Sequence, residues 1–274
     1  MRIVSPTPLQ RFTIATDTTP PAIAFATDGT GPHVWEWTFE WRTYRQTGRV
    51  QTPGNSWAAQ TEFADLGGRL TVRVTAGRES ASVTATVVGA NPTAQQLSAY
   101  LTAQPDSDGF LAIIQHESHG NHFGPNGEPI RSFDGGYGMC QLTTPAPTYQ
   151  QCWSWKRNVL GGLALFGEKR RAAATYLRQS GRTYTADQLR RETVARWNGG
   201  AYHHWDGRQW ERNPDILCDP NTGNIGWNMT DADNAGQTLA QLRARDGGAF
   251  RRARPAGANW IYSGVCYADA LLGA

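Results

Sequence analysis

The stretch Val34-Trp35-Glu36-Trp37-Thr38-Phe39-Glu40-Trp41 places a polar residue after each large aromatic residue. Such alternation predicts a β-strand with one buried face, because successive side chains of a strand point to opposite sides. Residues 70–74 and 83–87 repeat the alternation with β-branched side chains, and turns rich in Gly, Pro and Asn separate these stretches. Residues 1–90 are therefore predicted to form a small all-β sandwich.

The period changes after residues 89–93, which are predicted to be a linker that leads into a helix. The apolar residues from Phe110 to Ile114 form a helical stripe, and residues 154–178, 185–197 and 258–272 are predicted to be further helices. Residues 91–274 are therefore expected to be a mainly-α domain. No stretch approaches 18 consecutive apolar residues, so we expect no membrane insertion.

The amino-acid composition limits the kinds of molecule that the protein is expected to bind. The 274 residues include 26 Lys and Arg against 23 Asp and Glu, a formal net charge of +3. So small an excess, without aromatic residues interleaved among the arginines, predicts no nucleic-acid partner. A mild positive charge nevertheless favours approach to an anionic polymer. The four cysteines match no zinc-binding spacing, which leaves free thiols or two disulfides in any of three pairings.

The segment Ile113-Ile114-Gln115-His116-Glu117-Ser118-His119-Gly120 ends an apolar helix in a carboxylate. An acid in this position is expected to be partly desolvated, which favours its protonated form. A general acid at neutral pH requires that protonated form. Glu117 is therefore the candidate for acid–base chemistry.

Four segments that follow in order carry further motifs: Ser132-Phe133-Asp134-Gly135-Gly136-Tyr137-Gly138-Met139-Cys140-Gln141-Leu142-Thr143, Asn158-Val159-Leu160-Gly161-Gly162, Ala195-Arg196-Trp197-Asn198-Gly199-Gly200-Ala201-Tyr202 and Tyr262-Ser263-Gly264-Val265-Cys266-Tyr267. Together with Glu117-Ser118 they resemble the lysozyme-like family of goose-type lysozymes and soluble lytic transglycosylases, glycoside hydrolase family 23. The resemblance covers about residues 93–272 and implies a lysozyme-like fold for residues 91–274. Residues 1–90 resemble the immunoglobulin-like sandwiches of bacterial surface and secreted enzymes, which implies a docking or substrate-binding domain.

The resemblance implies a role for individual residues. Glu117 matches the catalytic acid, Gly138 and Gln141 match the turn that shapes the substrate groove, and Asn198 matches an asparagine beside the sugar. Trp197 stands where the family has a tyrosine and lacks its hydroxyl, while Tyr262 matches a tyrosine of the terminal helix. The expected substrate-binding residues are Ser118, Tyr137, Gly138, Gln141, Thr143, Trp197, Asn198 and Tyr262.

The number of acids near Glu117 distinguishes two reactions. Hydrolysis normally uses two carboxylates, whereas a lytic transglycosylase needs one, because the C6 hydroxyl of the substrate replaces water. Asp134 is the candidate second acid of a hydrolytic muramidase, and Glu128 is a weaker one. The resemblance to goose-type lysozymes implies another aspartate just after Gln141, but Leu142, Thr143 and Thr144 stand there. These residues favour a transglycosylase that cleaves the MurNAc–GlcNAc bond of peptidoglycan.

The sequence also bears on two other classes of protein, a metalloprotein and a glycan-binding protein without catalytic activity. His116, His119 and His122 lie around Glu117, but His-Glu-x-x-His is one residue longer than the spacing found, so no metal and no cofactor are expected. A non-catalytic glycan-binding protein that keeps the groove is the alternative to an enzyme.

The first six residues, Met1-Arg2-Ile3-Val4-Ser5-Pro6, show no apolar leader and no cleavage site. For a wall-cleaving protein this predicts export by a specialised secretion machine, or release as a phage lysin, with action in the periplasm or on the cell wall. The expected partners are peptidoglycan glycan strands, a component of the secretion machine and an immunity protein that protects the producer of an antibacterial effector.

Overall fold

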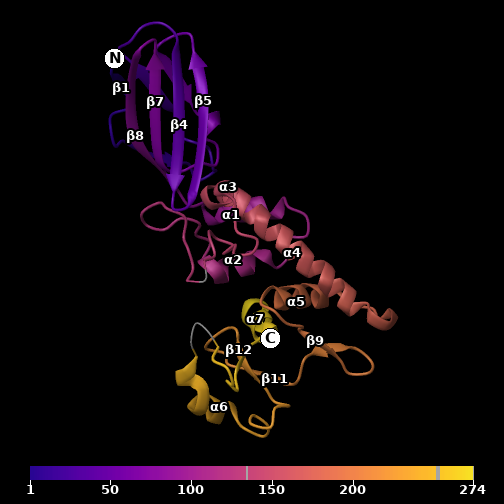
Figure 1. Cartoon of the computed structure of the whole chain (residues 1–274). Coiled ribbons are helices and arrows are strands. Elements are labelled where there is room, and N and C mark those ends of the chain that lie inside the picture. Colours follow the sequence, from indigo (N-terminus) through magenta and orange to yellow (C-terminus); the bar gives the residue numbers. More distant parts are fainter. Residues whose placement is uncertain (134, 251–253, 274) are drawn as a thin grey trace. The chain divides into compact units, whose positions relative to one another are not determined.

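The computed structural model describes residues 1–133, 135–250 and 254–273 (Figure 1). β-Sheets make up the N-terminal part, and all seven α-helices of the described residues lie after residue 93. The chain divides into two compact units, Met1–Ala103 with Glu117–Gly162, and Gln104–His116 with Leu163–Ala274.

Two sheets form the N-terminal part of the first unit. The larger has the order β2-β8-β7-β4-β5, and the smaller has the order β1-β3-β6. β2 runs parallel to β8, and the other pairs are antiparallel. Their bounds are β1 Ile3–Ser5, β2 Arg11–Ile14, β3 Ile23–Thr27, β4 His33–Trp41, β5 Tyr44–Thr52, β6 Ser56–Ala59, β7 Gly68–Ala76 and β8 Glu79–Gly89, with a 3₁₀ turn at Thr61–Phe63.

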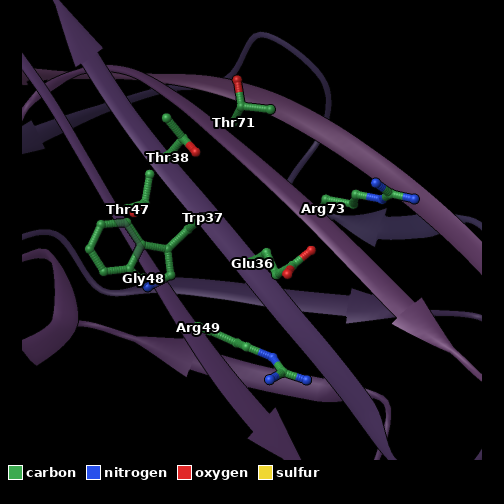
Figure 2. A pocket seen from close by; sticks show the side chains of 8 residues that line it. All are labelled: Glu36, Trp37, Thr38, Thr47, Gly48, Arg49, Thr71 and Arg73. Atoms are coloured by element: carbon green, nitrogen blue, oxygen red, sulfur yellow. The ribbon is translucent and has the colours of Figure 1, made fainter.

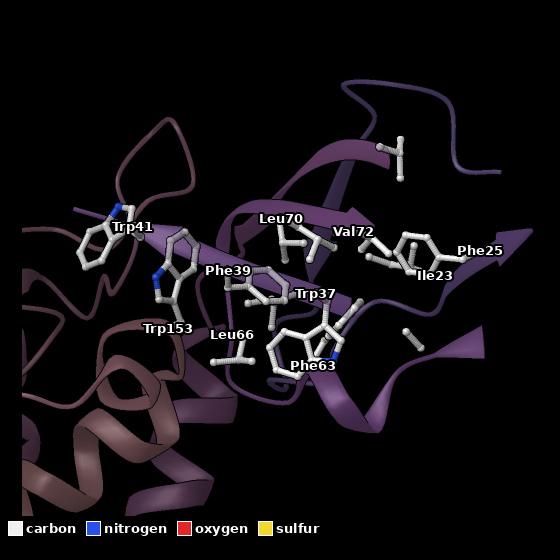
Figure 3. Close-up of a cluster of buried hydrophobic side chains, with 14 of the residues drawn as sticks. Ile23, Phe25, Trp37, Phe39, Trp41, Phe63, Leu66, Leu70, Val72 and Trp153 are labelled. Carbon is white, nitrogen blue, oxygen red and sulfur yellow. The ribbon is translucent and has the colours of Figure 1, made fainter. Parts of the chain in front are cut away.

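The aromatic alternation of β4 builds the core between these sheets. Every second residue of β4, from His33 to Trp41, is buried. The ring of Phe25 on β3 lies 6.1 Å from Trp35 on β4 and stacks on Trp57 of β6 at 5.1 Å, so the sheets pack face to face (Figure 3). The strands predicted at 34–41, 70–74 and 83–87 are therefore confirmed.

The segment 117–162 shares the same core. It contains α3 (Tyr149–Trp153) and the first residues of α4 (Trp155–Leu177). Trp153 is fully buried, and its ring lies 5.5 Å from that of Trp41. Figure 3 shows the two rings as neighbours. A side chain on Gly67 would overlap the Trp153 indole, so only glycine permits this approach. The Tyr149 hydroxyl donates to the carbonyl of Gly67 at 2.6 Å.

The linker ends in a short helix of the first unit. α1 (Ala94–Thr102) begins with a capping box, in which the Thr93 hydroxyl accepts from the Gln96 N–H and the Gln96 side chain accepts from the Thr93 N–H. Asn91 accepts from the N–H groups of His122 and Phe123 at 2.7 and 2.8 Å. The linker is therefore fixed to the loop that follows Glu117.

The second unit combines helices with short strands. Its helices are α2 (Phe110–Ser118) as far as His116, the remainder of α4, α5 (Ala186–Trp197), α6 (Leu239–Asp246) and α7 (Gly264–Leu272). A hairpin joins β9 (His203–Trp205) to β10 (Trp210–Arg212), and a sheet has the order β11 (Ile216–Cys218), β12 (Ile225–Asn228), β13 (Ile261–Tyr262). Short 3₁₀ turns occupy Gln179–Gly181 and Gly247–Ala249.

The helix predictions hold for most of this region. Residues 154–178 and 185–197 correspond to α4 and α5. The helix expected at 258–272 begins only at Gly264, because Ile261 and Tyr262 pair with β12 as a strand. Among the described residues, no helix has both the length and the apolar character that a membrane crossing requires.

The four cysteines are neither all free nor all paired in two disulfides. Cys218 and Cys266 form a disulfide whose Cα atoms are 5.3 Å apart. Cys140 and Cys152 are free thiols, and both are buried. The chain thus contains one disulfide, in the second unit, and two thiols in the first.

Candidate functional site

Glu117 and Ser118 are the last two residues of α2. Ile113 and Ile114, one turn earlier, are fully buried, as the apolar stripe predicted. The helix ends because His119 and Gly120 both have positive φ, 54° and 75°. Ser118 is buried, but Glu117 is exposed. The partial desolvation expected for Glu117 is therefore not found in the structure.

The glycine-rich segment forms a tight turn in the same unit. Tyr137 and Leu142 exchange two backbone hydrogen bonds of 3.1 Å across it. Gly138 has φ +71°, and a Cβ atom there would lie 2.6 Å from both Nδ1 of His122 and Nδ2 of Asn158. Glycine is thus required at this position for two reasons, its backbone conformation and the lack of space.

The side chain of Gln141 is hydrogen-bonded to the backbone of the turn itself. Its side-chain amide donates to the carbonyl of Gly138 at 2.6 Å, and its own φ is +48°. Its N–H bonds to the same carbonyl at 3.1 Å. Gln141 therefore stabilises the turn.

Asn158 joins the turn to α4. It is fully buried, its Oδ1 accepts from the N–H of Cys140 at 2.9 Å, and its Nδ2 donates to the carbonyl of Tyr137 at 3.0 Å. Asn158 opens the sequence segment 158–162, for which no role of its own was predicted. No local signal marked it, because Lys156 and Arg157 directly before it are polar as well.

His122 supports the turn from the other side. It is fully buried, and its Nε2 lies 2.8 Å from the carbonyl of Cys152, while Nδ1 lies 3.3 Å from the N–H of Met139. A carbonyl only accepts and an N–H only donates, so the neutral ring with its proton on Nε2 satisfies both contacts. Burial lowers the pKa of His122 to about 4. His122 is therefore neutral at physiological pH and has a structural role.

Glu117 is electrostatically coupled to the turn. Burial, and then the negative charge of Glu117, raise the pKa of the Cys140 thiol. His122, in the loop that follows Glu117, bonds to the N–H of Met139 and so links this loop to the turn. The first unit thus brings together Glu117, Ser118 and the turn from Gly138 to Gln141.

The remaining candidates of this unit differ in exposure. Thr143 is exposed just after the turn. The Tyr137 ring instead packs 5.5 Å from the ring of Trp41, and the Arg131 guanidinium lies 5.6 Å from the centre of the Tyr137 ring. Tyr137 therefore holds the turn against β4.

A hollow of about 400 Å³ adjoins Ser118 and is lined by Asn91, Ser118, Asn121, Phe123, Gly124, Pro125 and Ile130.

The other three candidates belong to the second unit. Trp197 packs its ring 5.6 Å from Phe110 and 6.4 Å from Phe166. Asn198 caps the C-terminus of α5, and its buried Nδ2 has no hydrogen-bond partner among the described residues. Tyr262 lies on β13, 37% exposed, with its ring edge-on to Trp260 at 5.2 Å.

The second acid of the hydrolytic alternative, Asp134, lies outside the described residues. Among the residues described, no cluster of three or more His, Cys, Asp or Glu side chains is arranged to hold a metal ion. No protein-family model matches the chain, and no curated protein matches it either.

Proposed function

We propose that this protein is a peptidoglycan lytic transglycosylase that cleaves the β-1,4 bond between MurNAc and GlcNAc. Glu117 protonates the glycosidic oxygen as the bond to C1 of MurNAc breaks. The resulting carboxylate then removes the proton of the C6 hydroxyl of the same sugar, and the C6 oxygen bonds to C1. The products are a GlcNAc hydroxyl end and a 1,6-anhydro-MurNAc end, and no water is consumed.

One observation carries this proposal: Glu117 ends an apolar helix in the same compact unit as the turn from Gly138 to Gln141, and His122 of the loop that follows Glu117 is hydrogen-bonded to that turn. The order of these parts is the order that resembles the lysozyme-like family. Exposure of Glu117 is compatible with the reaction, because the glycan itself covers the carboxyl group when it binds and thereby desolvates it.

The turn contributes shape in this proposal. The N–H groups of Gly138, Met139 and Cys140 donate to Ile130, His122 and Asn158. They are therefore occupied and do not serve as donors to the substrate. We propose that the rigid turn forms one wall against which the sugar rests, and that Thr143, exposed beside it, contributes a hydroxyl.

Substitution of the acid tests the proposal. Glu117→Gln retains size and loses the transferable proton, so release of fragments from purified peptidoglycan should fall by a factor of at least about 100. Glu168→Gln is the matched control, because Glu168 is an exposed acid on α4. Sedimentation with the wall should still occur for Glu117→Gln. Cleavage at the wild-type rate by this variant would refute the assignment.

A further inference from the structure

The outer face of the five-stranded sheet is polar and exposed, opposite the face that covers the aromatic core. On β4 the side chains that alternate with the aromatic residues are Val34, Glu36, Thr38 and Glu40. The neighbouring strands present arginines and hydroxyl-bearing residues on this side, which are largely exposed. Folding of the core leaves this face unused, because it needs only the other side of each strand.

Strand register arranges this face into three rows. One row has Glu36 between Arg49 and Arg73. A parallel row has Glu40 between Arg45 and Arg69, and continues through Thr86 to Arg11. Between them runs a row of hydroxyls, Thr47, Thr38, Thr71 and Thr84. The two arginine rows are four residues apart along the strands, or about 13 Å.

The face is hollowed at both arginine rows. One hollow, of about 480 Å³, is lined by Glu36, Arg49, Arg73 and the threonines beside them, and Figure 2 shows Glu36 between the two arginines. A second hollow, of about 580 Å³, includes Arg11, Glu40, Arg69, Thr84 and Thr86 among its lining residues. Both hollows belong to the first unit, and the second also reaches the core residues Trp41 and Trp153.

The charge on this face is only partly neutralised. Five arginines stand against two glutamates, a local net charge of +3. Nε of Arg45 lies 3.7 Å from Oε1 of Glu40, so these two side chains form an ion pair. Arg49 and Arg73, by contrast, form no ion pair with any residue in the described ranges. Their guanidinium groups are therefore available to an anionic ligand.

We infer that this sheet face, defined by the two arginine rows and the threonine row, binds the carboxylate-bearing peptide stems of peptidoglycan. Arginine forks pair with carboxylates in two-point contacts. The glutamate at the centre of each row accepts from amide N–H groups and repels a polymer with a charge on every unit. The threonine row offers hydroxyls to amides and sugars. A ligand with sparse carboxylates among amides and hydroxyls matches this pattern.

The inference rests on the proposed function for the identity of the polymer, and it assigns the sheet a separate task. Glu117 would act on the glycan backbone, whereas the sheet face would recognise the stems. Binding by the sheet face would raise the time that the enzyme spends on the wall without contributing to the chemical step.

The test measures binding of full-length protein, with Glu117→Gln present throughout to prevent cleavage. The probe is insoluble peptidoglycan treated with hydrofluoric acid, which removes phosphodiester-linked polymers. Arg49→Gln with Arg73→Gln should weaken sedimentation with this wall at least about tenfold, since two charge-assisted contacts are lost. The matched control is Arg171→Gln with Arg208→Gln, two exposed arginines of the second unit, which should bind within about twofold of the parent.

A chemical change in the probe tests the ligand group. Amidation of the stem carboxylates should reduce binding of the parent to the level of the Arg49→Gln, Arg73→Gln variant, and added salt should weaken what the parent binds. Equal binding by the variant, or binding unchanged by amidation, would overturn the inference. Binding seen only before hydrofluoric acid treatment would assign the face to a phosphate polymer and would overturn it as well.

These results are separable from the catalytic proposal. Failure of the catalytic proposal would appear as the absence of products from the wild-type chain, and the binding assay does not depend on products. Cleavage by the wild type, together with unchanged binding by the arginine variant, would reject the sheet-face inference alone. Thermal unfolding of each arginine variant at the parent temperature verifies that the surface substitutions leave the fold intact.

Discussion

Gly138 and His122 approach so closely that a Cβ atom on Gly138 would lie 2.6 Å from Nδ1 of the imidazole. The imidazole in turn bonds to the N–H of Met139, the residue after Gly138, and to the carbonyl of Cys152. The turn beside Glu117 is therefore held by a buried ring that leaves room for glycine only.

Gly138→Ala tests this packing. We expect a loss of more than about 2 kcal/mol in the free energy of unfolding, because strain at φ +71° adds to the clash with His122. Gly181→Ala is the matched control, because Gly181 has φ +73° and open space around its Cα. It should lose only the strain, about 1 kcal/mol. Urea unfolding of both variants measures the difference, and equal losses would contradict the close approach.

The low pKa of His122 predicts a pH dependence of stability. In the folded chain this pKa is about 4, below the ordinary value of 6.5. The unfolded chain therefore binds more protons between these two pH values, and stability falls as the pH falls from 6.5 to 4. The contribution of His122 is fully present above pH 6.5, and its loss reaches about 3 kcal/mol near pH 4.

A variant without the titrating group isolates this contribution. His122→Gln should be less stable than the wild type at pH 7, and the difference between them should shrink toward pH 4. Urea unfolding of both proteins across this range provides the comparison. A difference that stays constant with pH would show that His122 does not carry the effect.

Trp153 links the segment around the site to the sheets. Trp153→Ala should lower the free energy of unfolding by about 4 kcal/mol, because the fully buried ring leaves a cavity next to Trp41 and Gly67. Trp205→Ala, which removes a half-buried ring, should lower the free energy of unfolding by less.

The core shared by the sheets and residues 117–162 predicts the effect of a truncation. A chain that starts at residue 91 should lose the order of residues 117–162, as measured by hydrogen exchange. Full protection of that segment in the shortened chain would contradict the shared core.

The strand half of the fold was predictable because one residue in two is aromatic from Trp35 to Trp41, and a period of two has one structural meaning. The long helices were predictable for the same reason at period 3.6, and α5 began within one residue of its expected start. Strands such as β13, with two residues, are too short to carry a period. Such strands form because a neighbouring strand pairs with them, and this pairing depends on residues that are distant in the sequence.

The residues of the candidate site also fall into two groups, those with a local sequence signal and those whose role depends on distant residues. Glu117 and the glycine turn carry local signals, namely an acid at the end of an apolar run and a cluster of glycines. The roles of His122 and Asn158 depend on residues 17 to 30 positions away along the chain, so no local pattern could assign them. The choice of Cys218 and Cys266 as the disulfide pair likewise depends on the packing of α7 near β11.

The central claim, that Glu117 performs transglycosylation, is tested most directly by mass spectrometry of the fragments released from purified peptidoglycan. The wild type should release muropeptides lighter by one water than hydrolytic products, with 1,6-anhydro-MurNAc ends, and Glu117→Gln should release none. Fragments with reducing MurNAc ends from the wild type would contradict the account and indicate a water-activating second acid. Anhydro products from Glu117→Gln would equally contradict it.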